Sequence, residues 1–140
     1  MTAYLLDVNV LLALSWPGHQ FHERVQNWFA AHARKGWATC PMVEAGFVRI
    51  LSNPAFSERA VSAKEAVDAL RFNTKHPAHQ FWPDDLPLAE ALARMERRIE
   101  GHQQVTDAYL LGLALHHKGK LATLDQGIRA WGAGAVEMIE

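Results

Sequence analysis

The sequence predicts an α/β fold, a three-layer α/β/α sandwich around a central, mostly parallel sheet of about five strands. Two observations predict it: short apolar runs alternate with longer amphipathic segments along the chain, and turn residues separate most of them. Strands that alternate with helices form βαβ units, which place parallel strands in one sheet and helices on both faces. With 140 residues and no internal repeat, residues 1–140 are expected to form one domain.

The first half of the chain contains two predicted strand–helix units. Residues 4–7 are an expected strand at the start of the apolar run YLLDVNVLLAL, which then passes into a helix. Residues 20–33 have the spacing of an amphipathic helix, and Gly36 ends it. The second strand is expected at 37–40 (WATC), followed by a helix that a proline opens and the SNP at 52–54 closes.

The middle of the chain predicts a helix, a strand and a further helix. Ser62 and Glu65 form a capping-box pattern, which predicts a helix that reaches about residue 73. Residues 79–82 (HQFW) are the expected third strand. The segment 86–98 has a helical pattern. One side of this helix is expected to carry Arg94, Arg97 and Arg98.

The last third is expected to hold one helix and two strands. Thr106 is expected to cap a helix that starts at Asp107, has two histidines and a lysine in its last turn, and stops at Gly119. Residues 120–125 (KLATLD) predict the fourth strand, and AVEMIE near the C-terminus predicts a short fifth.

The composition is that of a folded protein without membrane segments. Hydrophobic residues make up 49% of the chain and charged residues 21%. No segment approaches the roughly 18 apolar residues of a membrane span, and no basic leader precedes Asp7, so we expect a cytoplasmic protein with no membrane partner. The lone Cys40 cannot form an internal disulfide and is expected to pack at a strand end without a chemical role.

Four acids fall where predicted strands end or predicted helices begin. Asp7 ends the first strand, Glu44 lies near the start of the helix after the second, Asp107 opens a helix, and Asp125 ends the fourth strand. These positions share one edge of a parallel sheet, where ligands bind. Each acid alone has an ordinary explanation, such as the helix dipole or a turn. Four together repel one another, and no Lys or Arg is evident within these motifs, so the sequence predicts a bound divalent cation.

An all-oxygen site is typical of Mg²⁺ or Mn²⁺. Such an ion supports hydrolysis of a phosphodiester, which makes metal-assisted phosphodiester hydrolysis the leading chemistry. The formal net charge is only −1, but eleven acids remain outside the predicted site and face fourteen Lys and Arg. The surface outside the site then has a net charge of +3, which admits a polyanionic substrate.

Together these motifs resemble PIN-domain ribonucleases, most closely the VapC toxins of bacterial toxin–antitoxin pairs. The resemblance rests on LLDVNVLLAL, TCPMVEAGFVRILSNP, QVTDAYLLGLALHH and LATLD, and covers almost the whole chain in the expected order and spacing. It implies a PIN-like domain in which Asp7, Glu44, Asp107 and Asp125 hold one or two Mg²⁺ or Mn²⁺ ions. It further implies a toxin that acts as an endoribonuclease on single-stranded or looped RNA, forms a homodimer, and is inhibited by a VapB-like antitoxin.

Two polar residues beside the acids are candidates for supporting the site. Asn9 is expected either to hold Asp7 or a metal-bound water by a hydrogen bond, or to cap the end of the strand. Thr106 is expected either to touch the same water network or simply to cap its helix.

Two arginines are candidates for contacting RNA. Arg49 is five residues from Glu44, roughly 140° around an ideal helix, so the two should not share a face. A salt bridge at the surface or at an interface is the alternative role for Arg49. Gln126 stands where a basic residue often follows the last acid of the family, and Arg129, one turn further on, is a possible substitute.

Two other functions remain open at this stage. A haloacid-dehalogenase-like phosphatase would use Asp7 as a covalent nucleophile, but that chemistry needs a general acid two residues later, where this chain has Asn9. A catalytically silent module that binds RNA or a partner protein on the same fold is the second alternative.

Overall fold

The computed structural model describes residues 2–56, 61–94, 99–131 and 134–140. Its strands all belong to one sheet. They are β1 (Tyr4–Leu6), β2 (Trp37–Thr39), β3 (His79–Phe81), β4 (Lys120–Thr123) and β5 (Val136–Met138). Each neighbouring pair is parallel, in the order β3-β2-β1-β4-β5. The predicted parallel sheet of about five strands is therefore confirmed.

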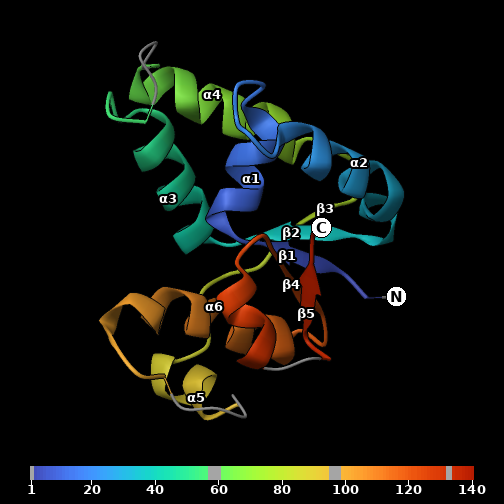
Figure 1. Cartoon of the computed structure of the whole chain (residues 1–140), viewed down its shortest axis with the longest axis vertical. Coiled ribbons are helices and arrows are strands. Elements are labelled where there is room, and N and C mark those ends of the chain that lie inside the picture. The colour runs from blue at the N-terminus through green and yellow to red at the C-terminus, as the bar shows by residue number, and fades with distance from the viewer. Residues whose placement is uncertain (1, 57–60, 95–98, 132–133) are drawn as a thin grey trace.

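Helices cover both faces of this sheet. The α-helices are α1 (Val8–Ser15), α2 (His22–His32), α3 (Pro41–Leu51), α4 (Ala63–Thr74), α5 (Leu88–Ala93) and α6 (Val105–His116). The 3₁₀ helices are η1 (Ala33–Lys35), η2 (His102–Gln104) and η3 (Gln126–Trp131). Figure 1 shows α1 to α4 on one side of the sheet and α5 and α6 on the other, which confirms the α/β/α sandwich.

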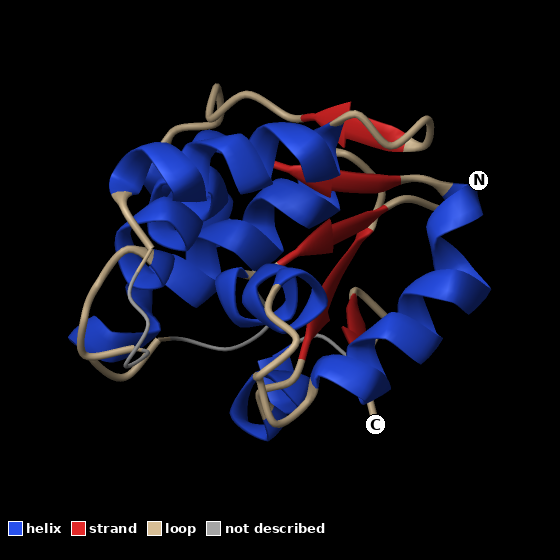
Figure 2. Cartoon of the chain, turned by 90° about the horizontal axis from the view of Figure 1, so that it is seen from above, coloured by secondary structure: helices blue, strands red, loops and turns tan. Residues whose placement is uncertain are grey.

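The strand order fixes where a ligand site can form. From β1 the chain proceeds outward through β2 to β3, then returns through α5 and α6 to place β4 on the other side of β1. The connections therefore diverge between β1 and β4. In an open parallel sheet, the crevice beyond the carboxyl ends of the two strands at such a point is the usual ligand site. In Figure 2 the strand arrows, which mark the carboxyl ends, point toward a side of the molecule where several helices lie.

The core consists of the central strands and the helix faces that pack on them. Leu5 and Leu6 of β1 are fully buried, as are Leu121 of β4 and most of the apolar residues of α6. The tryptophans Trp28, Trp37 and Trp82 are buried as well. Within the described residues, none of the helices is both long enough and apolar enough to cross a membrane.

Several local predictions are confirmed. Ser62 and Glu65 form the expected capping box at the start of α4, with both reciprocal hydrogen bonds present. Gly36 follows α2 and η1 with a φ of 109°, a conformation that strongly favours glycine. Cys40 is buried at the end of β2, and burial is the main reason that its pKa rises to about 12. The thiol is therefore unreactive at neutral pH.

Several predicted boundaries are wrong. α6 begins at Val105 and not at Asp107, because the 3₁₀ helix η2 runs directly into it; Thr106 consequently lies inside the helix and does not cap it. The fourth strand ends at Thr123, so Asp125 lies in the turn that follows. α6 ends at His116, so His117 and Lys118 follow the helix, and Lys118 has a positive φ of 57°.

The helix predicted at 86–98 is shorter in the part of this segment that the structure describes. α5 spans Leu88–Ala93 and Arg94 follows as its C-cap, so a helix through Arg94 is not observed. Arg97 and Arg98 lie outside the described residues. Arg94 itself is exposed and its Nη2 lies 3.3 Å from Nδ1 of His116 on α6.

Gly112 on α6 is required for the close packing of α5, because a Cβ placed there would lie 2.4 Å from the carbonyl oxygen of Ala91. We predict that Gly112→Ala lowers the free energy of unfolding by about 1–3 kcal/mol through overpacking, since backbone atoms cannot give way as a side chain can. Gly101→Ala is the matched control, because Gly101 is exposed and nothing lies within 4 Å of its would-be Cβ. Urea unfolding followed by circular dichroism measures both. An equal effect of the two substitutions would contradict this account.

Candidate active site

Asp7 lies between β1 and α1 and is the N-cap of α1. Its backbone is extended (φ −73°, ψ 171°), and Oδ1 accepts a hydrogen bond of 3.0 Å from the backbone N–H of Val10. Such a cap satisfies one of the unpaired N–H groups at the start of a helix. The strand predicted at 4–7 thus ends at Leu6, and the acid follows it directly at the carboxyl edge.

Thr123 joins the ends of the two central strands. Its hydroxyl donates a hydrogen bond of 2.6 Å to Oδ2 of Asp7, and its Oγ1 accepts one of 3.0 Å from the backbone N–H of Asp125. Thr123 is fully buried at the end of β4. Sequence reasoning missed this residue; its signal was a hydroxyl at the end of a strand, two residues before an acid.

The carboxyl group of Asp7 is buried, with a 5% exposed fraction. Its pKa is raised to about 6, mainly by burial; the hydrogen bonds from Thr123 and Val10 oppose the rise, and the nearby charges of Asp107 and Asp125 add to it. The residue is at the sheet edge, but it is still buried.

Asp107 and Asp125 lie close enough to Asp7 to affect its charge. Asp107 is half-buried in the first turn of α6, and its pKa is raised by burial and by the charge of Asp125. Asp125 is exposed, and its Oδ1 accepts a hydrogen bond of 2.8 Å from the N–H of Gly127. The turn that was the ordinary explanation for Asp125 is therefore present. The fold nevertheless brings these three carboxylates together at the carboxyl edge.

Glu44 lies in the first turn of α3 and is half-buried. Its Oε2 accepts a hydrogen bond of 2.7 Å from the hydroxyl of Thr39, the last residue of β2. Thr39 Oγ1 in turn lies 2.8 Å from Nε2 of His79 at the start of β3. This hydrogen bond ties Glu44 to the end of β2, which pairs with β1, the strand that Asp7 follows.

Asn9 and Thr106 are both exposed and both lie inside helices. Asn9 is the second residue of α1, whose cap is the side chain of Asp7, so the alternative role of Asn9 as a cap is wrong. Thr106 occupies the second position of α6, and no side-chain hydrogen bond caps that helix. Among the described residues, neither side chain forms a hydrogen bond with Asp7 or Asp125.

The two candidate arginines are exposed, and they lie in α3 and η3. Arg49 occupies the last turn of α3, at the opposite end from Glu44. Arg129 in η3 forms an ion pair with Glu140 near the C-terminus. The guanidinium of Arg129 is thus already engaged with a carboxylate.

The four predicted acids form no recorded salt bridge within the described residues. In that part of the chain, no three His, Cys, Asp or Glu side chains are arranged closely enough to hold a metal ion as they stand.

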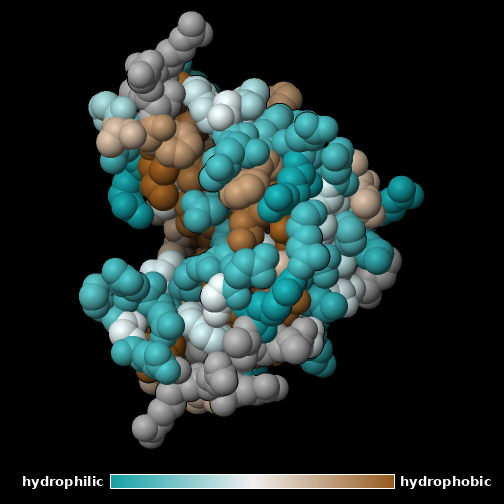
Figure 3. Space-filling model, viewed as in Figure 1, coloured by the Kyte–Doolittle hydropathy of each residue, from teal (hydrophilic) through white to brown (hydrophobic). Residues whose placement is uncertain are grey.

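The surface is hollowed on the side where α3 and α6 begin, between the two helical layers, and apolar residues line the upper wall of this hollow (Figure 3). Within the described residues, none of the four acids is neutralised by an ion pair.

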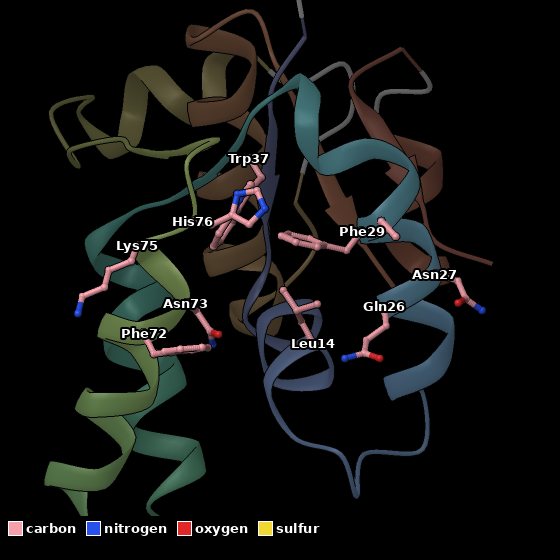
Figure 4. Close-up of a pocket in the computed structure, with 10 residues that line it drawn as sticks. Leu14, Gln26, Asn27, Phe29, Trp37, Phe72, Asn73, Lys75 and His76 are labelled. Atoms are coloured by element: carbon pink, nitrogen blue, oxygen red, sulfur yellow. The ribbon is translucent and has the colours of Figure 1, made fainter.

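A second hollow, with a volume of about 690 Å³, lies among α1, α2, α4 and the sheet. Figure 4 shows Leu14, Phe29, Trp37, Phe72 and His76 around it, with Phe72 at its open side. Trp37 is the first residue of β2, so this hollow lies toward the amino ends of the strands. No acid is among the residues that line it, and the carboxylate chemistry therefore belongs to the other edge.

Comparison with known proteins agrees with this architecture. Residues 4–133 match the family described as PIN domain. Ribonuclease VapC39 of Mycobacterium tuberculosis is 42% identical over 140 residues, which span 99% of this chain and all of that one. Ribonuclease VapC38 of the same species is 43% identical over 124 residues, which span 89% of this chain and 86% of that one.

Solved structures share the fold at lower identity. VapBC2 of Rickettsia felis, bound to a promoter DNA fragment, has a TM-score of 0.70 at 12% identity and covers 99% of this chain and all of that one. VapC20 of M. tuberculosis, described as a toxin that cleaves the sarcin–ricin loop, has a TM-score of 0.68 at 17% identity, covering 98% and 99%. With the acidic edge and the strand order described above, these matches show that the chain belongs to the PIN-domain family and, within it, to the VapC proteins.

Proposed function

We propose that this chain is a divalent-metal-dependent endoribonuclease toxin in which Asp7, Glu44, Asp107 and Asp125 form the metal site. The observation that carries the proposal is the buried carboxylate of Asp7 at the point where the strand connections diverge, with two further aspartates within electrostatic reach. Ribonuclease activity itself follows from the VapC relatives at 40–43% identity.

The residues of this edge fit Mg²⁺ or Mn²⁺. The donors are all carboxylate oxygens, which hard divalent ions prefer. The pKa values of Asp7 and Asp107 are raised by burial and by neighbouring acids, so the protein alone stabilises the ionised forms poorly. Although both oxygens of Asp7 accept a hydrogen bond, each keeps a second lone pair that can face a cation. When bound, such an ion would activate water and stabilise charge on the phosphodiester.

Each side chain has a distinct task in this proposal. Asp7 and Asp107 are the principal ligands, and Asp125 binds directly or through water. Glu44 is a ligand of a second ion or orients the attacking water by accepting its hydrogen bond. Thr123 fixes the orientation of Asp7, because it donates to the carboxylate from a buried strand end. The exposed Asn9 and Thr106 are candidates for supporting the site through water, and the exposed Arg49 and Arg129 are candidates for contact with RNA.

The biological setting forms part of the same proposal. The similar structures include toxin–antitoxin complexes from Rickettsia felis and Klebsiella pneumoniae, which supports an antitoxin as a partner of this chain. We further propose a VapB-like antitoxin, a homodimer, and action on RNA in the cytoplasm. A small open reading frame beside this gene that encodes a DNA-binding protein would support the pairing without any assay.

The structure argues against one of the two alternative functions, and an assay is needed for the other. A covalent phosphatase needs an accessible nucleophile and a general acid two residues later. Asp7 is only 5% exposed and Asn9 is not an acid, so both requirements fail. A silent binding module differs from the proposed enzyme only in turnover, and a measurement of RNA cleavage separates the two.

We predict that the purified chain cuts RNA only with Mg²⁺ or Mn²⁺ and stops when the metal is chelated. Asp7→Asn should lower the rate by more than the 10- to 100-fold typical of losing a residue that only supports a ligand. Electrophoresis of a short labelled RNA panel measures both effects. The control is Asp68→Asn, since Asp68 is an exposed acid on α4 that pairs with Lys64. Wild-type rates in Asp7→Asn would refute the metal site, and RNA binding without turnover would indicate the silent module.

We predict a pH-dependent stability contribution from Asp7 in the metal-free chain. Its pKa rises from 3.8 in the unfolded chain to about 6 in the fold, so the folded state binds the extra proton between these values. Stability from this group is therefore present below about pH 4 and lost as the pH rises through about 6. The loss is about 3 kcal/mol, the equivalent of about two pKa units.

Asp7→Asn removes this titration, so its advantage in unfolding free energy over the wild type should be larger at pH 7 than at pH 4. Urea unfolding of both proteins at the two pH values, with a chelator present, measures the difference. Adding Mn²⁺ at pH 7 should reduce the advantage, because an ion that binds only the folded wild type stabilises it. A difference that does not change with pH would show that Asp7 is solvated in the fold.

A further inference from the structure

A chain of three polar side chains connects strand β3 to Glu44 across the end of β2. Nε2 of His79 lies 2.8 Å from Oγ1 of Thr39, and the hydroxyl of Thr39 donates to Oε2 of Glu44 over 2.7 Å. The three residues come from β3, β2 and α3, and His79 is 40 positions along the chain from Thr39. The fold, and not the local sequence, brings them together.

The chemistry of these groups sets the direction of the hydrogen bonds. An ionised carboxylate only accepts, and a threonine hydroxyl has a single hydrogen to donate. Because Thr39 gives that hydrogen to Glu44, it can only accept from His79, so Nε2 of His79 carries the hydrogen. Each bond therefore points toward the carboxylate, and hydrogen bonds aligned in one direction reinforce one another.

The middle of this chain is rigid because Thr39 is fully buried. A buried hydroxyl that lost its partners would be costly, so Thr39 holds both neighbours in place. The His79 ring also packs against the indole of Trp37, with ring centroids 4.7 Å apart. Trp37 is fully buried in β2. The imidazole is thus fixed on one side by the core and at Nε2 by Thr39.

We propose that Thr39 and His79 are positioning residues that orient the carboxylate of Glu44 for the reaction. This inference rests on the proposed function. Within the described residues, neither side chain forms a hydrogen bond with the three aspartates, and both act through Glu44. The bond to Thr39 occupies Oε2 and leaves Oε1, for which the described residues record no partner, to bind an ion or accept from water. Glu44 therefore serves the site through one oxygen only.

Thr39→Val tests the chain with little change of shape, because it replaces the hydroxyl with a methyl group. Thr39→Ser keeps the hydroxyl and serves as the conservative rescue. His79→Leu removes the terminal donor, whereas His79→Gln keeps an N–H group in the same region. Ser52→Ala is the matched control, since it removes a hydroxyl at the far end of the same helix, where Ser52 bonds only the carbonyl of Val48.

The first readout is Mn²⁺ affinity of the metal-free protein, measured by calorimetry; the second is kcat and KM on a short RNA. Thr39→Val should weaken Mn²⁺ binding or kcat by about 10- to 100-fold, the usual effect of losing a residue that supports a ligand. KM should stay unchanged, because a fully buried Thr39 cannot touch RNA. Thr39→Ser and Ser52→Ala should behave as the wild type, and His79→Leu should be more damaging than His79→Gln. Thermal melting shows which variants are folded at the assay temperature.

The decisive comparison repeats Thr39→Val in a Glu44→Gln background. A residue that acts only through Glu44 loses its effect there, so the substitution should cost nothing further in Mn²⁺ affinity. The same cost in both backgrounds would assign Thr39 a purely structural role and overturn the inference. An unaffected Thr39→Val in an active enzyme would also overturn it. A wild-type chain without metal-dependent cleavage would instead refute the proposed function, and this inference with it.

Discussion

The hydrogen bond from Thr123 to Asp7 is the interaction on which the rest of the site depends. It joins the ends of β4 and β1, the two strands between which the chain connections diverge, and it offsets part of the cost of burying a carboxylate. The backbone N–H of Asp7 also donates to the carbonyl of Ala122 on the same neighbouring strand. The other oxygen of Asp7 caps the N–H of Val10, so both oxygens are held, and the charges of Asp107 and Asp125 reach this carboxylate.

The architecture and the positions of the acids were predictable because they depend on local patterns. Apolar runs that alternate with amphipathic segments specify parallel strands and covering helices, and an acid just after a strand must lie at the carboxyl edge. Capping signals such as Ser62 with Glu65 act within one turn, so sequence alone placed the start of α4 correctly. The convergence of Asp7, Asp107 and Asp125 followed from this topology.

What sequence could not predict depends on residues far apart in the chain or on competing local structures. The link of Glu44 through Thr39 to His79 crosses three elements, and no periodicity in the sequence predicts it. The pairing of Arg129 with Glu140 likewise needs the chain's end to fold back beside η3. The start of α6 was misplaced because a 3₁₀ turn leads into the helix, a route that needs no side-chain cap and leaves Thr106 exposed.

Because Asp7 both caps α1 and belongs to the proposed metal site, a mutation at this position can remove folding and reactivity together. Replacement by alanine would leave the N–H of Val10 and the hydroxyl of Thr123 without their partner, and losing a cap of this kind typically costs about 1 kcal/mol. A gene under pressure to lose its toxicity could therefore escape at this codon through the lost cap as well as through failed chemistry. A genetic screen for harmless variants would recover both kinds at this position and could not tell them apart.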